Sequence, residues 1–384
     1  MYENIDIKIT KVEGISLSSP YGDGKSLGQP LGVKSIGIVR ITDEAGNYGI
    51  GETYSGVYSP DIIKIVIKFF EQYIIGKKIG DDSFIKNIEQ IPFIGGKGIF
   101  QSILSAIEIA LFDLRGKILQ VPSYKLLSKK IRESIPVYAS SGTAVFSPDE
   151  IESDVNNILD LGFNAYKMRI GYQDWNNDLK RIRAAKRILD KKKLMVDAIM
   201  GTLRPPWETK TAIEKVHDLI DFNLYWLEEP LFPDNIEGLK ELKNLNLVPI
   251  AAGEAYSSKL EFDLVLKTNA LNFLQFDATH SGGMKFCYNL ANQASRYNMK
   301  SALHVWGSAA AISANSHVGI SNPLIDYLEI PMVKLDLTDE MWIEKPTIQR
   351  GLLIPNDLPG LGIKLTDKLI SKYYFKKNSG YRIA

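Results

Sequence analysis

The sequence predicts an α/β protein with a (β/α)₈-type barrel and an α+β N-terminal capping domain that the C-terminal segment completes. Three short apolar runs, LMVDAIM, YWLEEP and VPIAAGE, each end on a carboxylate: Asp197, Glu228 and Glu254. Asp197 and Glu228 are 31 residues apart, and Glu228 and Glu254 are 26 apart. A strand, a loop, a helix and a second loop of such a barrel need about this length. The alternation of strand and helix patterns continues beyond these runs on both sides.

The first 130 residues predict the capping domain. Alternating polar and apolar residues indicate strands at 5–17, 35–43 and 48–52, with a hairpin turn at 44–47. Two loops rich in glycine, proline or tyrosine, 18–31 and 52–60, contain Tyr21 and Tyr54 and are expected to close over the barrel mouth. The 52–60 loop has an alternative role in packing between the domains. A helix is predicted from Ser59 to Ile75. Residues 99–119 are apolar on most faces, which predicts a helix buried between the two domains.

The barrel is predicted to span 131–355, and residues 356–384 are expected to pack back on the capping domain. Ser147 and Glu150 have the spacing of a capping box, and Gly162 is placed to end the helix that this box opens. The predicted strands are 136–140, 165–170, 194–199, 224–228, 248–252, 272–277, 301–305 and 325–330.

The composition excludes several classes of protein. Formal net charge is +1 and no basic stripe occurs, so nucleic acid is not an expected partner. No apolar run is long enough to span a bilayer. Cys287 is the single cysteine and the N-terminus lacks the apolar core of a signal peptide, so we expect a reducing, cytoplasmic location.

The strand ends carry the chemistry. One acidic residue after a strand is usually a helix cap or a surface charge, but three in register at one mouth repel each other unless a cation binds. Oxygen ligands alone favour a hard ion, so we expect Mg²⁺. Lys167 and Arg169 are two residues apart on one strand and therefore point together into the barrel.

The same register continues to Asp277, His304 and Glu329. A histidine there has an alternative role as a core residue, but the two flanking acids favour a function. A neutral His304, oriented by Asp277, is a candidate base near pH 7.

With these residues the chain resembles the mandelate racemase/muconate lactonizing enzyme subgroup of the enolase superfamily. The motifs are Asp197, Glu228 in EEP, Glu254 in AGE, the K-x-R pair, and the Asp277–His304–Glu329 set. The resemblance implies Mg²⁺-assisted removal of the proton α to a carboxylate, giving an enediolate. It also implies a homo-oligomer and a small carboxylate substrate. Glu329 would be protonated and hydrogen-bond the enediolate, its pKa raised by acidic neighbours.

Three positions depart from the subgroup's pattern. Arg169 stands where racemase-like members have a second lysine base, and an arginine stays protonated, so base chemistry by His304 alone is expected. The usual D-x-N is Asp197-Ala-Ile199, and the long loop after it is a candidate to bring Arg204 or Trp207 to the substrate. His280 lies where the lactonizing branch has a lysine; it is a candidate acid for a leaving hydroxyl or else a helix cap.

The leading prediction is an acid-sugar dehydratase that forms a 2-keto-3-deoxy acid. A sugar-acid lactone cycloisomerase is the runner-up, because the run from His304 to Gly307 is similar to those enzymes. A racemase or epimerase is third, and a non-catalytic barrel that binds metal and sugar acid is the alternative class. The predicted substrate-binding residues are Tyr21, Tyr54, Arg204, His280 and Trp306.

Overall fold

The computed structural model describes residues 2–22, 28–129 and 131–382. Its N-terminal part is a three-stranded antiparallel sheet in the order β1-β2-β3. The strands are β1 (Ile9–Pro20), β2 (Val33–Asp43) and β3 (Tyr48–Thr53). Four helices accompany this sheet: α2 (Ile63–Ile74), α3 (Ser83–Glu89), α4 (Gly98–Leu119) and α5 (Tyr124–Leu127).

The two predicted loops are more ordered than their composition indicated. The end of β1 takes up residues 18–20, and Pro30–Gly32 forms a 3₁₀ turn, while residues 23–27 lie outside the described part. In the second loop, α1 (Ser55–Tyr58) and a 3₁₀ turn (Pro60–Ile62) replace irregular chain. Ser102 Oγ of α4 accepts a hydrogen bond from Ser55 N at 3.1 Å, a long-range contact that the local sequence does not reveal.

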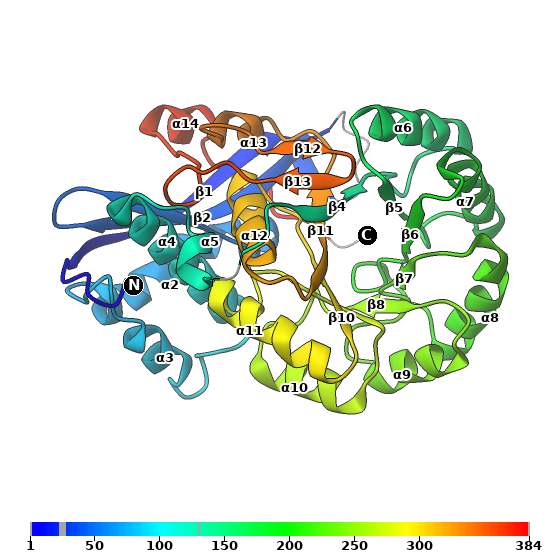
Figure 1. Ribbon diagram of the computed structural model, residues 1–384, viewed down its shortest axis with the longest axis horizontal. Helices are drawn as coiled ribbons and strands as arrows, with labels where there is room; N and C mark the ends of the chain where they lie inside the picture. The colour runs from blue at the N-terminus through cyan, green and yellow to red at the C-terminus, as the bar shows by residue number, and fades with distance from the viewer. Residues whose placement is uncertain (1, 23–27, 130, 383–384) are drawn as a thin grey trace.

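Eight parallel strands form the predicted closed barrel, because β11 pairs with β4 (Figure 1). They are β4 (Ile135–Ser140), β5 (Ala165–Arg169), β6 (Lys193–Asp197), β7 (Trp226–Glu228), β8 (Ile250–Ala252), β9 (Phe273–Phe276), β10 (Lys300–Leu303) and β11 (Ile325–Pro331). The helices between them are α6 (Pro148–Asp160), α7 (Trp175–Leu189), α8 (Thr209–Leu219), α9 (Ile236–Leu245), α10 (Lys259–Thr268), α11 (Gly283–Arg296) and α12 (Ala309–Ser321). Ser147 and Glu150 form the predicted capping box of α6.

The eighth helical position differs from the regular pattern. After β11 the chain forms only the six-residue α13 (Asp336–Met341) and the hairpin of β12 (Thr347–Gln349) and β13 (Leu352–Ile354). β13 pairs with β4 in the antiparallel sense. The chain then returns to the N-terminal sheet: Figure 1 shows α13 and α14 (Asp367–Lys372) beside β1, and Tyr374 bridges to Leu17.

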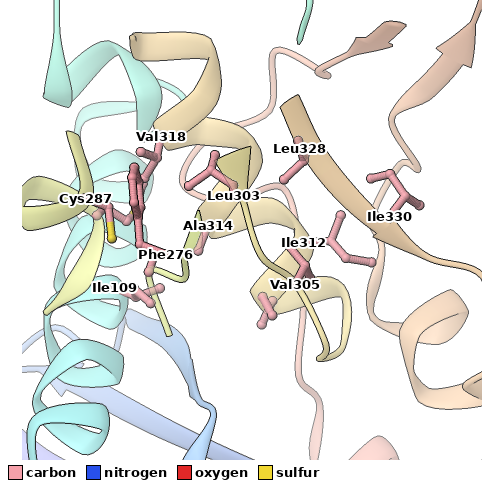
Figure 2. Close-up of a cluster of buried hydrophobic side chains, with 14 of the residues drawn as sticks. Ile109, Phe276, Cys287, Leu303, Val305, Ile312, Ala314, Val318, Leu328 and Ile330 are labelled. Atoms are coloured by element: carbon pink, nitrogen blue, oxygen red, sulfur yellow. The ribbon is translucent and has the colours of Figure 1, made fainter. Parts of the chain in front are cut away.

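The core is continuous between the barrel wall and α4. Figure 2 shows one part of it, where apolar side chains of β9, β10 and β11 meet those of α11, α12 and α4. Ile109, Phe276 and Leu303 are all buried there. None of the helices in the described part of the chain is long and apolar enough to cross a membrane.

Helix α4 supports the loop that follows β9. Ser105 Oγ accepts a hydrogen bond from Gly282 N at 2.9 Å, and Ser102 Oγ donates one to Thr279 O at 3.0 Å. The Glu108 carboxylate accepts from Met284 N and Lys285 N at 2.8 and 3.0 Å. The predicted buried helix therefore holds the start of α11 in place.

Glu108 makes this contact sensitive to pH. Burial raises the pKa of Glu108 from 4.5 to about 7, although the two backbone donors oppose the shift. Between these values the folded protein binds more protons at this site than the unfolded chain, so the contribution of Glu108 to stability falls as pH rises. We expect Glu108→Gln to flatten the stability–pH curve in this window.

Urea unfolding at several pH values between about 5 and 8 measures the effect. Glu241→Gln, on an exposed position of α9, is the matched control and should leave the curve unchanged. A parallel offset of the Glu108→Gln curve, with the same slope as the parent protein, would contradict the prediction.

Candidate active site

The carboxyl ends of β6, β7 and β8 bring the three predicted carboxylates to one mouth. Asp197 pairs with Glu228 across β6 and β7, and Arg169 of β5 pairs with Asp197. Glu254 follows three residues after Ala251, the partner of Glu228 on β8. Asp197, Glu254, His304 and Glu329 line one cavity of about 90 Å³, together with Lys167 and Arg169.

Lys167 lies at the centre of these acids. Its ammonium group pairs with Glu228, lies 3.0 Å from Glu329 Oε1 and 3.8 Å from Asp197 Oδ2. Although burial opposes the shift, the charges of Glu228 and Glu329 raise the pKa of Lys167 well above its usual value. A buried lysine that faces three carboxylates stays charged and partly compensates their repulsion.

The remaining contacts of Glu228 fix its orientation. Trp226 Nε1 and Gln275 Nε2 both donate to Glu228 Oε2, at 2.8 and 2.7 Å. Together with Lys167, these donors hold the Glu228 carboxylate in one orientation inside the barrel. Glu229, the next residue, is buried as well, and no basic side chain in the described part of the chain forms an ion pair with it. Burial, followed by the charges of Glu254 and Asp197, raises the pKa of Glu229 well above its usual value.

The donor set fits a hard divalent cation. Burial raises the pKa of Asp197 to about 6, with Lys167 opposing the shift and Glu254 adding to it. A bound cation would offset the repulsion between these buried carboxylates. A hard cation is favoured because every donor atom is an oxygen. Among the described residues, no three acids, histidines or cysteines lie close enough together to form a metal-binding cluster. In this arrangement the Lys167–Glu228 ion pair balances part of the acidic charge.

The backbone is strained directly after two of these strands. Ile199 has φ +48° and Glu229 has φ +40°, in the left-handed region that non-glycine residues seldom adopt. Ile199 occupies the position of the usual asparagine, the residue type better suited to this conformation. Such strain, held in place by the surrounding structure, is typical of functional sites.

His304 and Asp277 form the predicted pair at adjacent strand ends. His304 Nδ1 lies 3.1 Å from Asp277 Oδ2. The other oxygen, Oδ1, accepts from Thr279 N, Thr279 Oγ1 and Asn315 Nδ2, each at 2.8 Å. Asp277 is thus fixed as an acceptor, so Nδ1 of His304 carries its proton and Nε2 faces the cavity. Nε2 lies 3.4 Å from Glu254 Oε2.

Two protonation states differ from the sequence-based expectation. Burial lowers the pKa of His304, but Glu254 and the hydrogen bond to Asp277 raise it to about 9, so the imidazole is charged at pH 7. Glu254 is the largest of the raising causes, so any cation that neutralises Glu254 returns the histidine toward the neutral form.

The expectation of a protonated Glu329 is wrong. Burial raises its pKa, but Lys167, His304 and Arg169 outweigh burial and lower it to about 2. The neighbours that determine its charge are basic. The sequence had indicated acidic neighbours, because the adjacent strands end on carboxylates. Glu329 Oε2 also accepts from Val305 N at 3.0 Å, which ties the base-bearing segment to β11.

Arg169 projects into the cavity as predicted. It donates to Ser141 O at 2.8 Å and to Ser140 Oγ at 3.0 Å. Burial would lower the pKa of Arg169, but Asp197 and Glu329 raise it, so the guanidinium does not act as a base. It is placed to bind an anionic group beside Lys167.

Comparison with known proteins agrees with this geometry. A family model described as "Enolase C-terminal domain-like" matches residues 150–369, and one described as "Mandelate racemase / muconate lactonizing enzyme, N-terminal domain" matches residues 29–128. The chain belongs to the enolase superfamily, in its mandelate racemase/muconate lactonizing subgroup. It is therefore an enzyme of that superfamily.

Individual relatives are named as a dehydratase, a cycloisomerase and a racemase. The L-talarate/galactarate dehydratase of Salmonella typhimurium is 28% identical, over 92% of this chain and 87% of its own length. The 3,6-anhydro-D-galactonate cycloisomerase of Zobellia galactanivorans is also 28% identical, with a TM-score of 0.85 over 96% of this chain and 100% of that one. A racemase from Streptomyces coelicolor, solved with bound magnesium, is 25% identical, with a TM-score of 0.84 over 95% of this chain and 99% of that one.

The cavity that contains His304 has an aromatic wall on the side of the capping domain. Tyr21, Tyr54 and Trp306, all predicted, line it. Trp306 Nε1 donates to Tyr21 Oη at 2.9 Å, and the Tyr54 ring meets His304 edge-on at 5.5 Å. Residues from the two capping loops and from the segment after β10 therefore enclose His304.

The sequence reasoning missed Tyr381 as a site residue. Tyr381 comes from the C-terminal segment, and its ring lies 5.2 Å from both Trp306 and Tyr58. Tyr381 N also donates to Val57 O at 2.8 Å. No local pattern distinguishes this tyrosine, because the chain end reaches the cavity only through packing on the capping domain.

Two predicted substrate residues, and Trp207, lie elsewhere. Arg204 and His280 line a neighbouring cavity of about 740 Å³ that shares Tyr54, Tyr58, Thr202 and Glu254 with the first. Arg204 bonds to the carbonyls of Gly201 and Leu203 and covers Phe232. His280 Nε2 lies 3.3 Å from Ala255 O, and Trp207 packs against Trp175. Local loop contacts hold all three outside the catalytic cavity.

Removal of the Tyr381 ring should weaken substrate binding. Tyr381→Ala opens the aromatic wall without touching the acids or His304, so we expect KM to rise about two- to tenfold with a smaller change in kcat. Tyr374→Ala, at a 64% exposed tyrosine of the same segment, is the control and should leave both constants unchanged. Steady-state kinetics measure both variants; an equal effect of the two, or a loss confined to kcat, would contradict the assignment.

Proposed function

We propose that the enzyme removes the α-proton of a sugar acid and eliminates the β-oxygen, giving a 2-keto-3-deoxy acid. The observation that carries this proposal is the His304–Asp277 pair, held across a buried cavity from Lys167 and Arg169. One side of the cavity thus offers a single oriented base, and the other offers fixed positive charge for a carboxylate. This division of roles suits proton abstraction next to a carboxylate. It argues against a barrel that merely binds metal and sugar acid.

Asp197, Glu228 and Glu254 would hold the Mg²⁺ ion. When bound, the ion supplies Lewis-acid stabilisation of the charge that develops on the substrate carboxylate. Lys167 and Arg169 add fixed positive charge at the same end of the substrate. Both remain protonated, so they stabilise charge and leave the proton transfer to His304.

His304 would both remove the α-proton and supply a proton to the leaving oxygen. Nε2 takes the α-proton, while Asp277 stabilises the imidazolium through Nδ1. The C–O bond at the β-carbon then breaks, and the leaving oxygen takes up the proton that His304 holds. The resulting enol becomes the keto acid by protonation at carbon. For a free β-hydroxyl the leaving oxygen departs as water.

A cycloisomerase is the second candidate, favoured by the aromatic wall. Tyr54, Trp306 and Tyr381 present ring faces and edges where a linear sugar acid would need many hydrogen-bond partners. A cyclic acid offers apolar C–H faces to such a wall. The same proton abstraction would then open a ring ether at the β-carbon, with no loss of water. The similarity to the Zobellia cycloisomerase supports this alternative.

A screen of linear and cyclic sugar acids tests the function. The purified protein is incubated with each acid and Mg²⁺, and 2-keto product is detected with semicarbazide. We expect product from one structural class, loss of product with a chelator, and recovery on return of Mg²⁺. Product formation that persists at the parent rate in the His304→Asn variant would overturn the proposal.

The base mechanism predicts one-sided proton exchange. Since Arg169 does not accept a proton at neutral pH, substrate recovered from D₂O should contain no inverted α-carbon. His304→Asn should lower kcat by about 10²–10⁴. Arg169→Lys is the informative variant, because it restores a titratable group on the opposite face and should permit some epimerisation. Proton NMR follows both, and inverted epimer from the unmodified protein would exclude a single base.

The metal site predicts different roles for two adjacent glutamates. Glu228→Gln should weaken Mg²⁺ binding about tenfold or more, because it removes a ligand charge. Glu229→Gln, the matched control, has an equally buried carboxylate one residue away and should have the smaller effect. Calorimetric titration of both folded variants with Mg²⁺ measures the difference. A stronger effect of Glu229→Gln would move the ligand assignment to Glu229.

A further inference from the structure

Lys34 of β2 is a deeply buried lysine. Its side chain is 1% exposed, and its ammonium donates to Trp306 O at 2.7 Å. It lies over the ring of Trp306 at 3.8 Å and that of Tyr21 at 5.1 Å. It forms no ion pair with any residue in the described part of the chain. Burial lowers its pKa well below the usual value, although the charge of Glu52 opposes this shift. Buried charges in proteins are normally paired, so this environment requires an explanation.

Lys34 lines a cavity at the place where the barrel lacks a regular eighth helix. The cavity has a volume of about 350 Å³, within the range of about 300–1,000 Å³ found for small-molecule sites. It lies between α6, α12 and the segment from β11 to β13, where the eighth helix is replaced by α13 and the hairpin. Figure 2 labels two of its walls, Ile312 of α12 and Ile330 of β11. The further apolar lining includes Leu161, Phe163, Met332 and Leu353.

Two more polar groups in this cavity lack partners. Trp342 Nε1 is a buried N–H with no hydrogen-bond acceptor among the described residues, and Trp342 is only 8% exposed. Thr338 Oγ1 is likewise buried and without a partner there. Both residues line the same cavity as Lys34. Three residues whose side chains can donate a hydrogen bond, Lys34, Thr338 and Trp342, therefore line one cavity beside its apolar residues.

We propose that this cavity binds a small organic monocarboxylate with an apolar body, at a site separate from the active site. Lys34 pairs with the carboxylate, Trp342 and Thr338 provide further donors, and the aliphatic side chains cover the body of the ligand. One buried cation matches one negative charge. The cavity shares only Tyr21 and Val333 with the cavity at the barrel mouth, and it contains neither the carboxylates of that cavity nor His304. The acid that lines it, Asp339, pairs with Lys345 at 3.3 Å.

Binding to straight-chain carboxylates tests the site. The metal-free protein is titrated by calorimetry with butanoate, hexanoate and octanoate, and with 1-hexanol and acetate as controls that lack the charge or the body. We expect at least one of the three longer carboxylates to bind with a stoichiometry of one, and both controls to bind at least tenfold more weakly. Failure of all three to bind the folded protein would contradict the proposal.

Two variants locate the binding site. Lys34→Met removes the charge with little loss of volume and should weaken binding about tenfold or more, whereas Trp342→Phe removes only the N–H and should weaken it about three- to tenfold. Trp175→Phe, whose indole bonds to Asp218 outside the cavity, is the matched control and should bind normally. Arg169→Met should also bind normally, which separates this site from the catalytic cavity.

Thermal unfolding distinguishes the anion site from a structural role of Lys34. If the unpaired cation is kept for a ligand, Lys34→Met should raise Tm of the ligand-free protein and abolish the rise in Tm that the carboxylate gives the parent protein. A fall in Tm of Lys34→Met with unchanged carboxylate binding by both Lys34→Met and Trp342→Phe would overturn the proposal. These readouts do not depend on the proposed reaction.

Discussion

The Lys167 ammonium makes the acidic barrel mouth possible. Glu228, Glu329 and Asp197 are buried within 4 Å of it, where like charges would otherwise repel one another strongly. The lysine keeps Glu329 ionised, and this carboxylate accepts a hydrogen bond from Val305 N, the residue next to His304. The same cation faces the place where a substrate carboxylate would lie. One interaction thus links the stability of the site to its chemistry.

The capping domain completes the site by holding the segments that carry the base. Glu52 of β3 accepts hydrogen bonds from Ser308 N and Oγ and from Ala311 N, at the start of α12. Lys34 of β2 holds Trp306 O. A Cβ on Gly307 would lie 2.4 Å from Glu52 Oε1, so a larger residue there would displace the carboxylate from its present position. The chain after His304 is therefore fixed from the capping side, as α4 fixes the chain after Asp277.

The strand-end residues could be predicted because a parallel barrel converts sequence spacing into spatial convergence. Asp197, Glu228, His304 and the Lys167–Arg169 pair follow from that rule alone, and the eight strands lie where alternation placed them. The protonation of Glu329 could not be predicted, because it depends on which basic groups pack against it. Tyr381 could not be predicted, and the placement of Arg204 and His280 in the neighbouring cavity could not be predicted either, for a related reason. Their positions are set by long-range packing or by loop carbonyls, which leave no periodic trace in the sequence.

The central claim is that Asp197, Glu228 and Glu254 form one hard-cation site at the barrel mouth, with Lys167 beside it. A crystal structure of the protein grown with Mn²⁺ in place of Mg²⁺ tests this directly, because the anomalous signal locates the ion without reference to the surrounding chain. The account predicts a single strong peak within coordination distance of all three carboxylates, with the Lys167 side chain still beside Glu329. A peak bound by Glu229 instead of Glu228, or no peak at the mouth, would contradict it.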